Sequence, residues 1–256
     1  MIRRTRLTDF LNKPKFYYEI FHQKTKLREF PPETEMKDWP ENWKKISFKG
    51  YSRLKEVRLP EPSLPKVTLE KALLGRKSAR DYHGPISIRQ LSSLLYFSCG
   101  LQRNINKYKL NRFYPSAGAR YPLETYVISQ YVKGLQNGLY HYYIRSHSLE
   151  KLMEFDTFDH TKYFRQASVG QSAAIILVSA IFNRTTVKYG NRGYRFVMLE
   201  AGHLGQNIYL ISAALNMGCC AIGGFIENKL DKLVDIDGLH ESVIYAFALG
   251  NRNNLT

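Results

Sequence analysis

The stretch "VMLEAGHLGQNIYLISAAL", residues 197–215, carries the strongest structural signal in the chain. Apolar side chains recur there at spacings of three and four, which places them along one face of an α-helix. These positions are Val197, Ala201, Leu204, Ile208, Ile211 and Leu215. The pattern predicts the longest helix of the protein, ended by Gly218, with one side against a core.

Segments on both sides of this helix predict a sheet for it to pack against. Two are apolar almost throughout, and two are rich in β-branched and aromatic residues around an Asn137-Gly138 turn. The expected strands are "SAAIILVSAI" (172–181), "SVIYAFALG" (242–250), "ETYVISQYV" (124–132) and "GLYHYYIR" (138–145). Two helices are expected before them, "TLEKALLG" (68–75) and "SIRQLSSLLYFSCG" (87–100). The order predicts an α+β fold with a sheet packed against helices.

The first 66 residues differ from the rest of the chain. They contain "FPPETEMKDWPENW" (30–43) and "RLPEPSLP" (58–65), where prolines interrupt any long helix or central strand. Few apolar residues here could form an independent core. We expect residues 1–66 to be an extension with a helix at 14–24, wrapped as an arm on a main domain of residues 67–256.

Composition places the chain among globular proteins, with 44% hydrophobic and 23% charged residues. The longest apolar runs, such as 173–182, are about half of what a membrane span needs, so no membrane span is expected. No signal-peptide pattern follows the basic start "MIRRTRLTDF". The three cysteines, Cys99, Cys219 and Cys220, cannot make a disulfide framework. A cytoplasmic location is therefore expected.

The formal net charge of +16 favours anionic partners. Nucleic acid, a membrane surface, a phosphorylated cofactor and an acidic peptide all fit that charge. The basic residues are spread along the chain, however, and no run of five or six like charges occurs. A spread charge is weak support for a dedicated nucleic-acid surface, so a nucleic-acid-binding module is a distant alternative and we expect no nucleic-acid partner.

Three motifs have the composition of ligand-binding loops. "GRKSAR" (75–80) offers two guanidinium groups and a hydroxyl, which suit a phosphate, although a solvated basic turn has the same composition. "RFYPSAGARYPLETY" (112–126) has small residues that let backbone N–H groups approach a flat ligand, or it is a rigid turn. The glycine pair of "CAIGGFIENKL" (220–230), at an expected helix-to-loop junction, presents N–H groups to a ligand or is a plain helix cap.

The stretch "TTVKYGNRGYR" (185–195) is open to three interpretations. Its mixture of basic and aromatic residues suits a nucleic-acid contact, a surface loop, or a catalytic loop that presents Lys188 and Tyr189. The seven histidines show no metal-binding spacing, so no metal site is expected. His203, on the long helix, is expected to be a packed and hydrogen-bonded core residue.

Taken in order, the motifs resemble the SagB-type dehydrogenases. This is the branch of the nitroreductase-like FMN flavoprotein superfamily that oxidises azoline rings in ribosomally made peptide natural products. The matching segments are "RKSAR" (76–80), "YPSAGARYPLETYVIS" (114–129), "GLYHY" (138–142), "KYGNRGYRFVMLEAGHLGQNIYL" (188–210), "GGF" (223–225) and "ALGNR" (248–252). The likeness covers roughly residues 67–252, and "FHQKTK" (21–26) and "FKGYSRL" (48–54) resemble the family's leading segment.

The resemblance implies a nitroreductase-like fold, with an antiparallel-rich sheet flanked by helices and FMN at the interface of a homodimer formed along the long central helix. The implied phosphate and ribityl contacts are Arg76, Ser78, Arg80 and Arg252. The implied loop that reaches the flavin of the opposite subunit is Ser116, Ala117 and Gly118. The implied neighbours of the flavin N5 and O4 edge are Gly223 and Gly224, where glycine replaces the acidic residue of many nitroreductases and enlarges the space above the ring.

Lys188 and Tyr189 match the Lys-Tyr pair on which the azoline oxidases depend. Oxidation of thiazoline or oxazoline to thiazole or oxazole removes a proton from one ring carbon and a hydride from its neighbour. A lysine with a lowered pKa can take the proton, and a tyrosine can orient the substrate, relay the proton or stabilise developing charge. The expected activity is therefore that of an FMN-dependent azoline dehydrogenase.

The expected partners follow from the same resemblance. They are a heterocycle-containing precursor peptide, a second copy of the chain, and a cyclodehydratase in a multi-enzyme complex. The alternative within the same fold is an NAD(P)H-dependent nitro, quinone or flavin reductase. The Lys-Tyr pair and the form of the 115–122 loop favour the oxidase branch.

Overall fold

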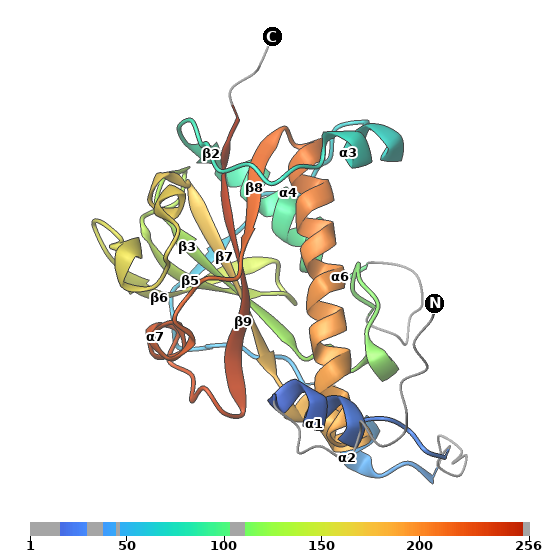
Figure 1. Cartoon of the computed structure of the whole chain (residues 1–256). Helices are drawn as coiled ribbons and strands as arrows, with labels where there is room; N and C mark the ends of the chain where they lie inside the picture. Colours follow the sequence, from blue (N-terminus) through green and yellow to red (C-terminus); the bar gives the residue numbers. More distant parts are fainter. Residues whose placement is uncertain (1–15, 30–37, 45–46, 103–110, 253–256) are drawn as a thin grey trace.

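The computed structural model describes residues 16–29, 38–44, 47–102 and 111–252 (Figure 1). Its centre is a seven-stranded sheet in which every neighbouring pair is antiparallel. The order across the sheet is β1 (Glu56–Arg58), β6 (Ser148–Glu154), β5 (Gly138–Tyr143), β3 (Leu123–Ser129), β7 (Ala174–Ile181), β9 (Glu241–Asn251) and β8 (Met217–Ile222). The α+β class expected from the sequence is confirmed.

Helices cover both faces of this sheet. The helices α4 (Ile88–Cys99) and α6 (Arg192–Ala214) contact each other and share one hydrophobic core with the inner face. On the opposite face, α7 (Glu227–Leu233) closes a second core. The remaining elements are α1 (Tyr17–Lys24), α2 (Glu41–Lys44), α3 (Leu69–Gly75), α5 (Asn183–Tyr189), the short strands β2 (Ile86–Ser87) and β4 (Val132–Lys133), and the 3-10 turns η3 (Ala117–Ala119), η4 (His160–Lys162) and η5 (Ala167–Gln171). In Figure 1, α3 lies near the C-terminal end of α6, while α1 and α2 lie near its N-terminal end.

The long helix forms as predicted but ends earlier than expected. Its apolar stripe faces the core, with Val197 and Leu204 fully buried. The helix stops at Ala214, and Asn216 adopts a left-handed conformation with φ 54°. The prediction that Gly218 ends the helix was wrong, because the chain has already turned and Gly218 lies inside strand β8.

The sequence also placed a two-residue turn at Asn137-Gly138, and the structure differs there. Gly138 is the first residue of β5 and pairs with Ser129, the last residue of β3. The intervening chain leaves the main sheet, and its strand β4 pairs in parallel with β2. The expected strand 124–132 is therefore divided between two sheets. Helix α4 begins with a capping box, in which the Gln90 backbone N–H donates to Ser87 Oγ and the Ser87 N–H donates to Gln90 Oε1.

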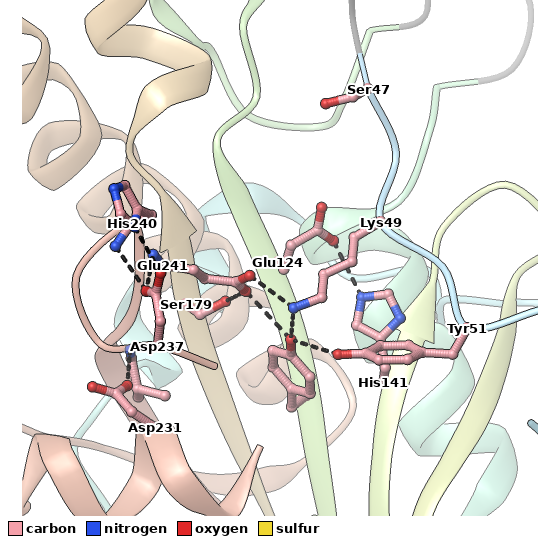
Figure 2. A network of polar contacts seen from close by, with 12 residues as sticks. Ser47, Lys49, Tyr51, Glu124, His141, Ser179, Asp231, Asp237, His240 and Glu241 are labelled. Atoms are coloured by element: carbon pink, nitrogen blue, oxygen red, sulfur yellow. Dashed lines mark hydrogen bonds and ion pairs between the residues drawn. The ribbon is translucent and has the colours of Figure 1, made fainter. Parts of the chain in front are cut away.

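Part of the first 66 residues joins the main sheet. Strand β1 pairs with β6, and just before it Lys49 reaches the centre of a polar network at one end of the sheet (Figure 2). Lys49 Nζ donates to the hydroxyl of Tyr126 and to the carboxylate of Glu241, each at 2.7 Å. Burial and the neighbouring carboxylate of Glu241 raise the pKa of Tyr126. The arm thus supplies the cation that pairs with the Glu241 carboxylate in the sheet.

All three cysteines are buried free thiols. Burial raises the pKa of Cys99 and Cys219 to about 12. Among the described residues, no helix combines the length and the apolarity needed to cross a bilayer.

Candidate functional site

Lys188 and Tyr189 form the last turn of helix α5. Gly190 follows in a conformation with φ 54° and ψ −147°, and α6 begins at Arg192. The interpretation of this stretch as a loop was therefore wrong for the pair itself, although the break between the two helices falls directly after it. The short helix fixes both side chains at the N-terminal end of α6.

The loop at 116–119 lies against this pair within the same chain. Gly118 has φ +61°, and a Cβ atom built on it would lie 2.6 Å from Tyr189 Oη and 3.5 Å from Lys188 Nζ. A side chain at position 118 would therefore collide with the tyrosine hydroxyl. The loop is anchored by Ser116, whose Oγ accepts from the Tyr121 backbone N–H at 2.8 Å and donates to Glu200 Oε2 at 2.6 Å.

The electrostatic environment of the pair is cationic. Desolvation lowers the pKa of Lys188, and the guanidinium of Arg120 lowers it further. Burial raises the pKa of Tyr189, while the same guanidinium opposes that rise. A lysine with a lowered pKa is more readily deprotonated near neutral pH, so it can accept a proton. The tyrosine stays protonated and can donate a hydrogen bond.

Two further residues near the pair were missed in the sequence. Glu200 on α6 is buried beneath the loop, and burial raises its pKa to about 8. Its Oε1 has no hydrogen-bond partner in the described part of the chain. Trp39 lies over Lys188, with the ammonium nitrogen 3.5 Å from the ring centroid. No sequence signal pointed to either contact, since Trp39 belongs to a segment read as a proline-interrupted arm.

Three of the four residues expected at a phosphate group, Arg76, Ser78 and Arg252, lie near the C-terminal end of α6. Ser78 Oγ lies 2.9 Å from the hydroxyl of Tyr209, and the Arg76 guanidinium lies 5.5 Å from the ring centroid of that tyrosine. Arg252 Nη1 donates to the carbonyl oxygen of Gly75 at 3.3 Å. Arg80 is exposed in the same segment. Among the described residues, the buried Arg252 Nε has no hydrogen-bond partner, so one donor of this guanidinium is unsatisfied.

The glycine pair follows a strand and not a helix. Gly223 and Gly224 are exposed directly after β8. The prediction that they follow a helix was therefore wrong. A Cβ atom at Gly223 would meet no atom within 4 Å. The backbone is therefore open to a ligand at this position.

One chain does not gather all the predicted residues at one point. The loop 116–118 contacts α6 at Glu200, whereas Ser78 contacts it at Tyr209. These positions are about 14 Å apart along the helix axis, at 1.5 Å per residue. A single ligand could contact both the 116–118 loop and the Ser78 region only if it were extended or if a second subunit supplied one of them.

The histidines are spread over the fold. Among the residues that the structure describes, no group of three or more His, Cys, Asp or Glu side chains could hold a metal ion. His203 is exposed on α6. The expectation of a packed core histidine was wrong, because His203 lies on the face of the helix that points away from the sheet.

The sequence model of the Nitroreductase family matches residues 73–251. The chain belongs to the nitroreductase family. Family membership indicates an oxidoreductase, and the fold described above is the one expected from the motifs.

Three curated relatives match this nitroreductase-family chain. MJ1384, a proposed nitroreductase of Methanocaldococcus jannaschii, is 32% identical over 184 residues, covering 71% of this chain and 90% of that protein. The microcin B17-processing protein McbC of Escherichia coli is 28% identical over 138 residues, half of each protein. The trifolitoxin-processing protein TfxB of Rhizobium leguminosarum bv. trifolii is 25% identical over 182 residues, 66% of this chain and 48% of that protein. The chain spans about half the length of the two processing proteins.

Solved structures agree with the family assignment. A proposed nitroreductase from Anabaena variabilis superposes with a TM-score of 0.73 at 22% identity, over 95% of this chain and 49% of that chain. A chain of the E. coli microcin synthetase McbBCD complex with truncated pro-MccB17 bound superposes with a TM-score of 0.57 at 19% identity, over 93% of this chain and 92% of that chain. At these identities the likeness establishes the fold.

Proposed function

We propose that this nitroreductase-family chain is an FMN-dependent dehydrogenase of the SagB type, which oxidises thiazoline or oxazoline rings to thiazole or oxazole in a ribosomally made peptide. The observation that carries the proposal is the contact of Lys188 and Tyr189 with the 116–118 loop. It is supported by the similarity to McbC and TfxB, which are named as processing proteins of two peptides.

The residues present fit an FMN phosphate. Arg76, Ser78, Arg80 and Arg252 would hold it, because guanidinium groups match phosphate oxygens and the Arg252 Nε has no hydrogen-bond partner among the residues that the structure describes. The open backbone at Gly223 and Gly224 would lie along the ring edge. The loop residues Ser116, Ala117 and Gly118 would approach the cofactor of the opposite subunit.

In this mechanism the pair acts on the azoline ring. Bound FMN would supply the acceptor for the hydride that leaves one ring carbon, and oxygen would take the electrons onward. Lys188 Nζ, in its neutral form, takes the proton from the neighbouring ring carbon. Tyr189 Oη donates a hydrogen bond that orients the ring. The substrate thus loses one hydride and one proton, which together are two hydrogens per ring.

The test uses a synthetic peptide carrying one thiazoline ring. The purified protein should show flavin absorption and should convert the peptide with a loss of two mass units, measured by mass spectrometry. K188A should lower turnover by about 100-fold or more, the scale of general base catalysis, while K229A at an exposed lysine of α7 should not. A colourless protein that does not bind added FMN, or equal turnover in K188A and wild type, would refute the proposal.

A second function is favoured by the 32% identity to the M. jannaschii relative. It is the NAD(P)H-dependent reduction of nitro compounds or quinones on the same fold. Rapid bleaching of the flavin by NADPH, with no reaction toward the azoline peptide, would select this alternative.

The partners belong to the proposal as well. A homodimer would form along the outer face of α6, where Leu199 is 61% exposed. A precursor peptide and a cyclodehydratase are proposed by analogy with the McbBCD complex, whose structure contains truncated pro-MccB17. A cytoplasmic location and the absence of a nucleic-acid partner remain predictions.

A further inference from the structure

We propose that Trp39 and Trp43 of the arm are part of the catalytic site, with Trp39 as a positioning residue for Lys188. The inference rests on the proposed function. It concerns a segment that lies outside residues 73–251, the part of the chain that matches the Nitroreductase family.

Aromatic rings surround the Lys188 ammonium. The nitrogen lies 3.5 Å from the ring centroid of Trp39, 5.6 Å from that of Trp43 and 5.5 Å from that of Tyr189. The two indoles meet edge to face, with centroids 6.1 Å apart. A cation over an indole face is attracted by the ring quadrupole, and Trp is the strongest such partner. The arm therefore provides the closest ring to the proposed base.

The arm is held in this place by hydrogen bonds to helix α5 and to the residue that follows the 116–119 loop. Trp43 Nε1 donates to the carbonyl oxygen of Val187 at 3.1 Å. Arg120 Nη1 donates to the carbonyl oxygen of Trp43, and its Nε donates to that of Arg184 at 2.7 Å. Arg184 Nε donates to Ser47 Oγ at 3.1 Å. Trp43 and Ser47 are thus tied to helix α5, which carries Lys188.

The aromatic rings can hold the Lys188 side chain in place without a carboxylate partner. The positive charge of Arg120 disfavours the protonated form of Lys188, and it therefore lowers the pKa of the lysine. A carboxylate could hold the lysine in place, but it would also keep the amine protonated. Within the described parts of the chain, no carboxylate forms an ion pair with Lys188. The indole face attracts the cation more weakly, so it can hold the flexible side chain near Gly118 and Tyr189 and still let the amine accept a proton.

The contact can be tested without substrate, because both tryptophans of the chain are in the arm and its fluorescence reports on them alone. K188M should change the emission intensity, since it removes the cation from the face of Trp39. The matched variant K229M, at an exposed lysine of α7, should leave emission unchanged. Identical spectra for K188M and wild type would overturn the proposal.

The catalytic role is tested with the one-ring thiazoline peptide. W39A should lower kcat about tenfold with KM within about twofold, the effect expected for loss of one partly desolvated cation–π contact. W39F should recover most of the rate, because a ring face is restored. Y17A, at an arm residue that is 90% exposed, serves as the control. Wild-type kcat in W39A, while K188A is inactive, would overturn the role of Trp39 and leave the proposed function standing.

Discussion

At the scale of single residues, the carboxyl group of Glu200 links the long helix to the 116–118 loop, and its protonation state affects stability. Its Oε2 accepts a hydrogen bond from Ser116 Oγ, and its Oε1 has no hydrogen-bond partner among the described residues. Burial raises its pKa to about 8, although the Ser116 hydrogen bond and the charge of Arg112 oppose that rise. A carboxyl group in such surroundings stays neutral at pH 7.

This state predicts a pH dependence of stability. Between about pH 4.5 and 8 the unfolded chain loses the Glu200 proton while the folded chain keeps it. The free energy of unfolding therefore falls as the pH rises through that window. E200Q removes this contribution. The melting temperature of E200Q minus that of wild type should therefore increase from pH 5 to pH 8. Thermal melts across this range measure the difference.

The control for Glu200 is E70Q, at an exposed glutamate of α3. Its melting temperature should follow that of wild type at every pH. A constant offset between E200Q and wild type from pH 5 to pH 8 would show that Glu200 is already ionised in the folded protein.

At the scale of elements, the fit of the 116–119 loop against helix α5 depends on a glycine. G118A forces alanine into a left-handed conformation, at a cost of about 1–2 kcal/mol, and pushes its Cβ toward Tyr189 Oη. Gly84 has a similar φ of +75°, but its Cβ position meets no atom within 4 Å. We expect G84A and G118A to lose similar stability, whereas only G118A loses turnover of the thiazoline peptide. Equal activity of the two variants would mean that the loop does not position Tyr189.

The elements themselves were predictable where the signal is local. The apolar stripe of α6 and the run at 172–181 depend only on spacing along the chain, and both elements formed. The end of α6 was not predictable from Gly218, since the turn is made by Asn216, a residue that can also adopt positive φ. Lys188 and Tyr189 were read as loop residues because the glycine after them ends a helix of only two turns.

At the scale of the whole molecule, the arm is bound at two separate places. Trp39, Trp43 and Ser47 contact helix α5, whereas Lys49 and strand β1 join the sheet. The candidate site residues were proposed from ordered sequence motifs, which gave no information on the side chains that surround them. The contact of Trp39 with Lys188 depends on how a remote segment crosses α5, and no local pattern encodes that path.

Two truncations separate these roles. A chain starting at Ser47 keeps the Lys49–Glu241 pair and β1, so it should melt within a few degrees of the full chain but turn over the thiazoline peptide more slowly. A chain starting at residue 67 leaves the largely buried carboxylate of Glu241 without its cation, which costs several kcal/mol. It should melt far lower or fail to fold. Similar melting temperatures for the two truncations would show that the sheet does not need the arm.

The three buried thiols have a consequence for the proposed function, in which electrons pass from the enzyme to oxygen. Such an enzyme releases peroxide beside its own surface, and the thiolate is the form of cysteine that peroxide oxidises. With Cys99, Cys219 and Cys220 all buried, and with burial raising the pKa of the first two to about 12, the cysteines offer peroxide no ready thiolate. Repeated turnover in air should leave its cysteines reduced.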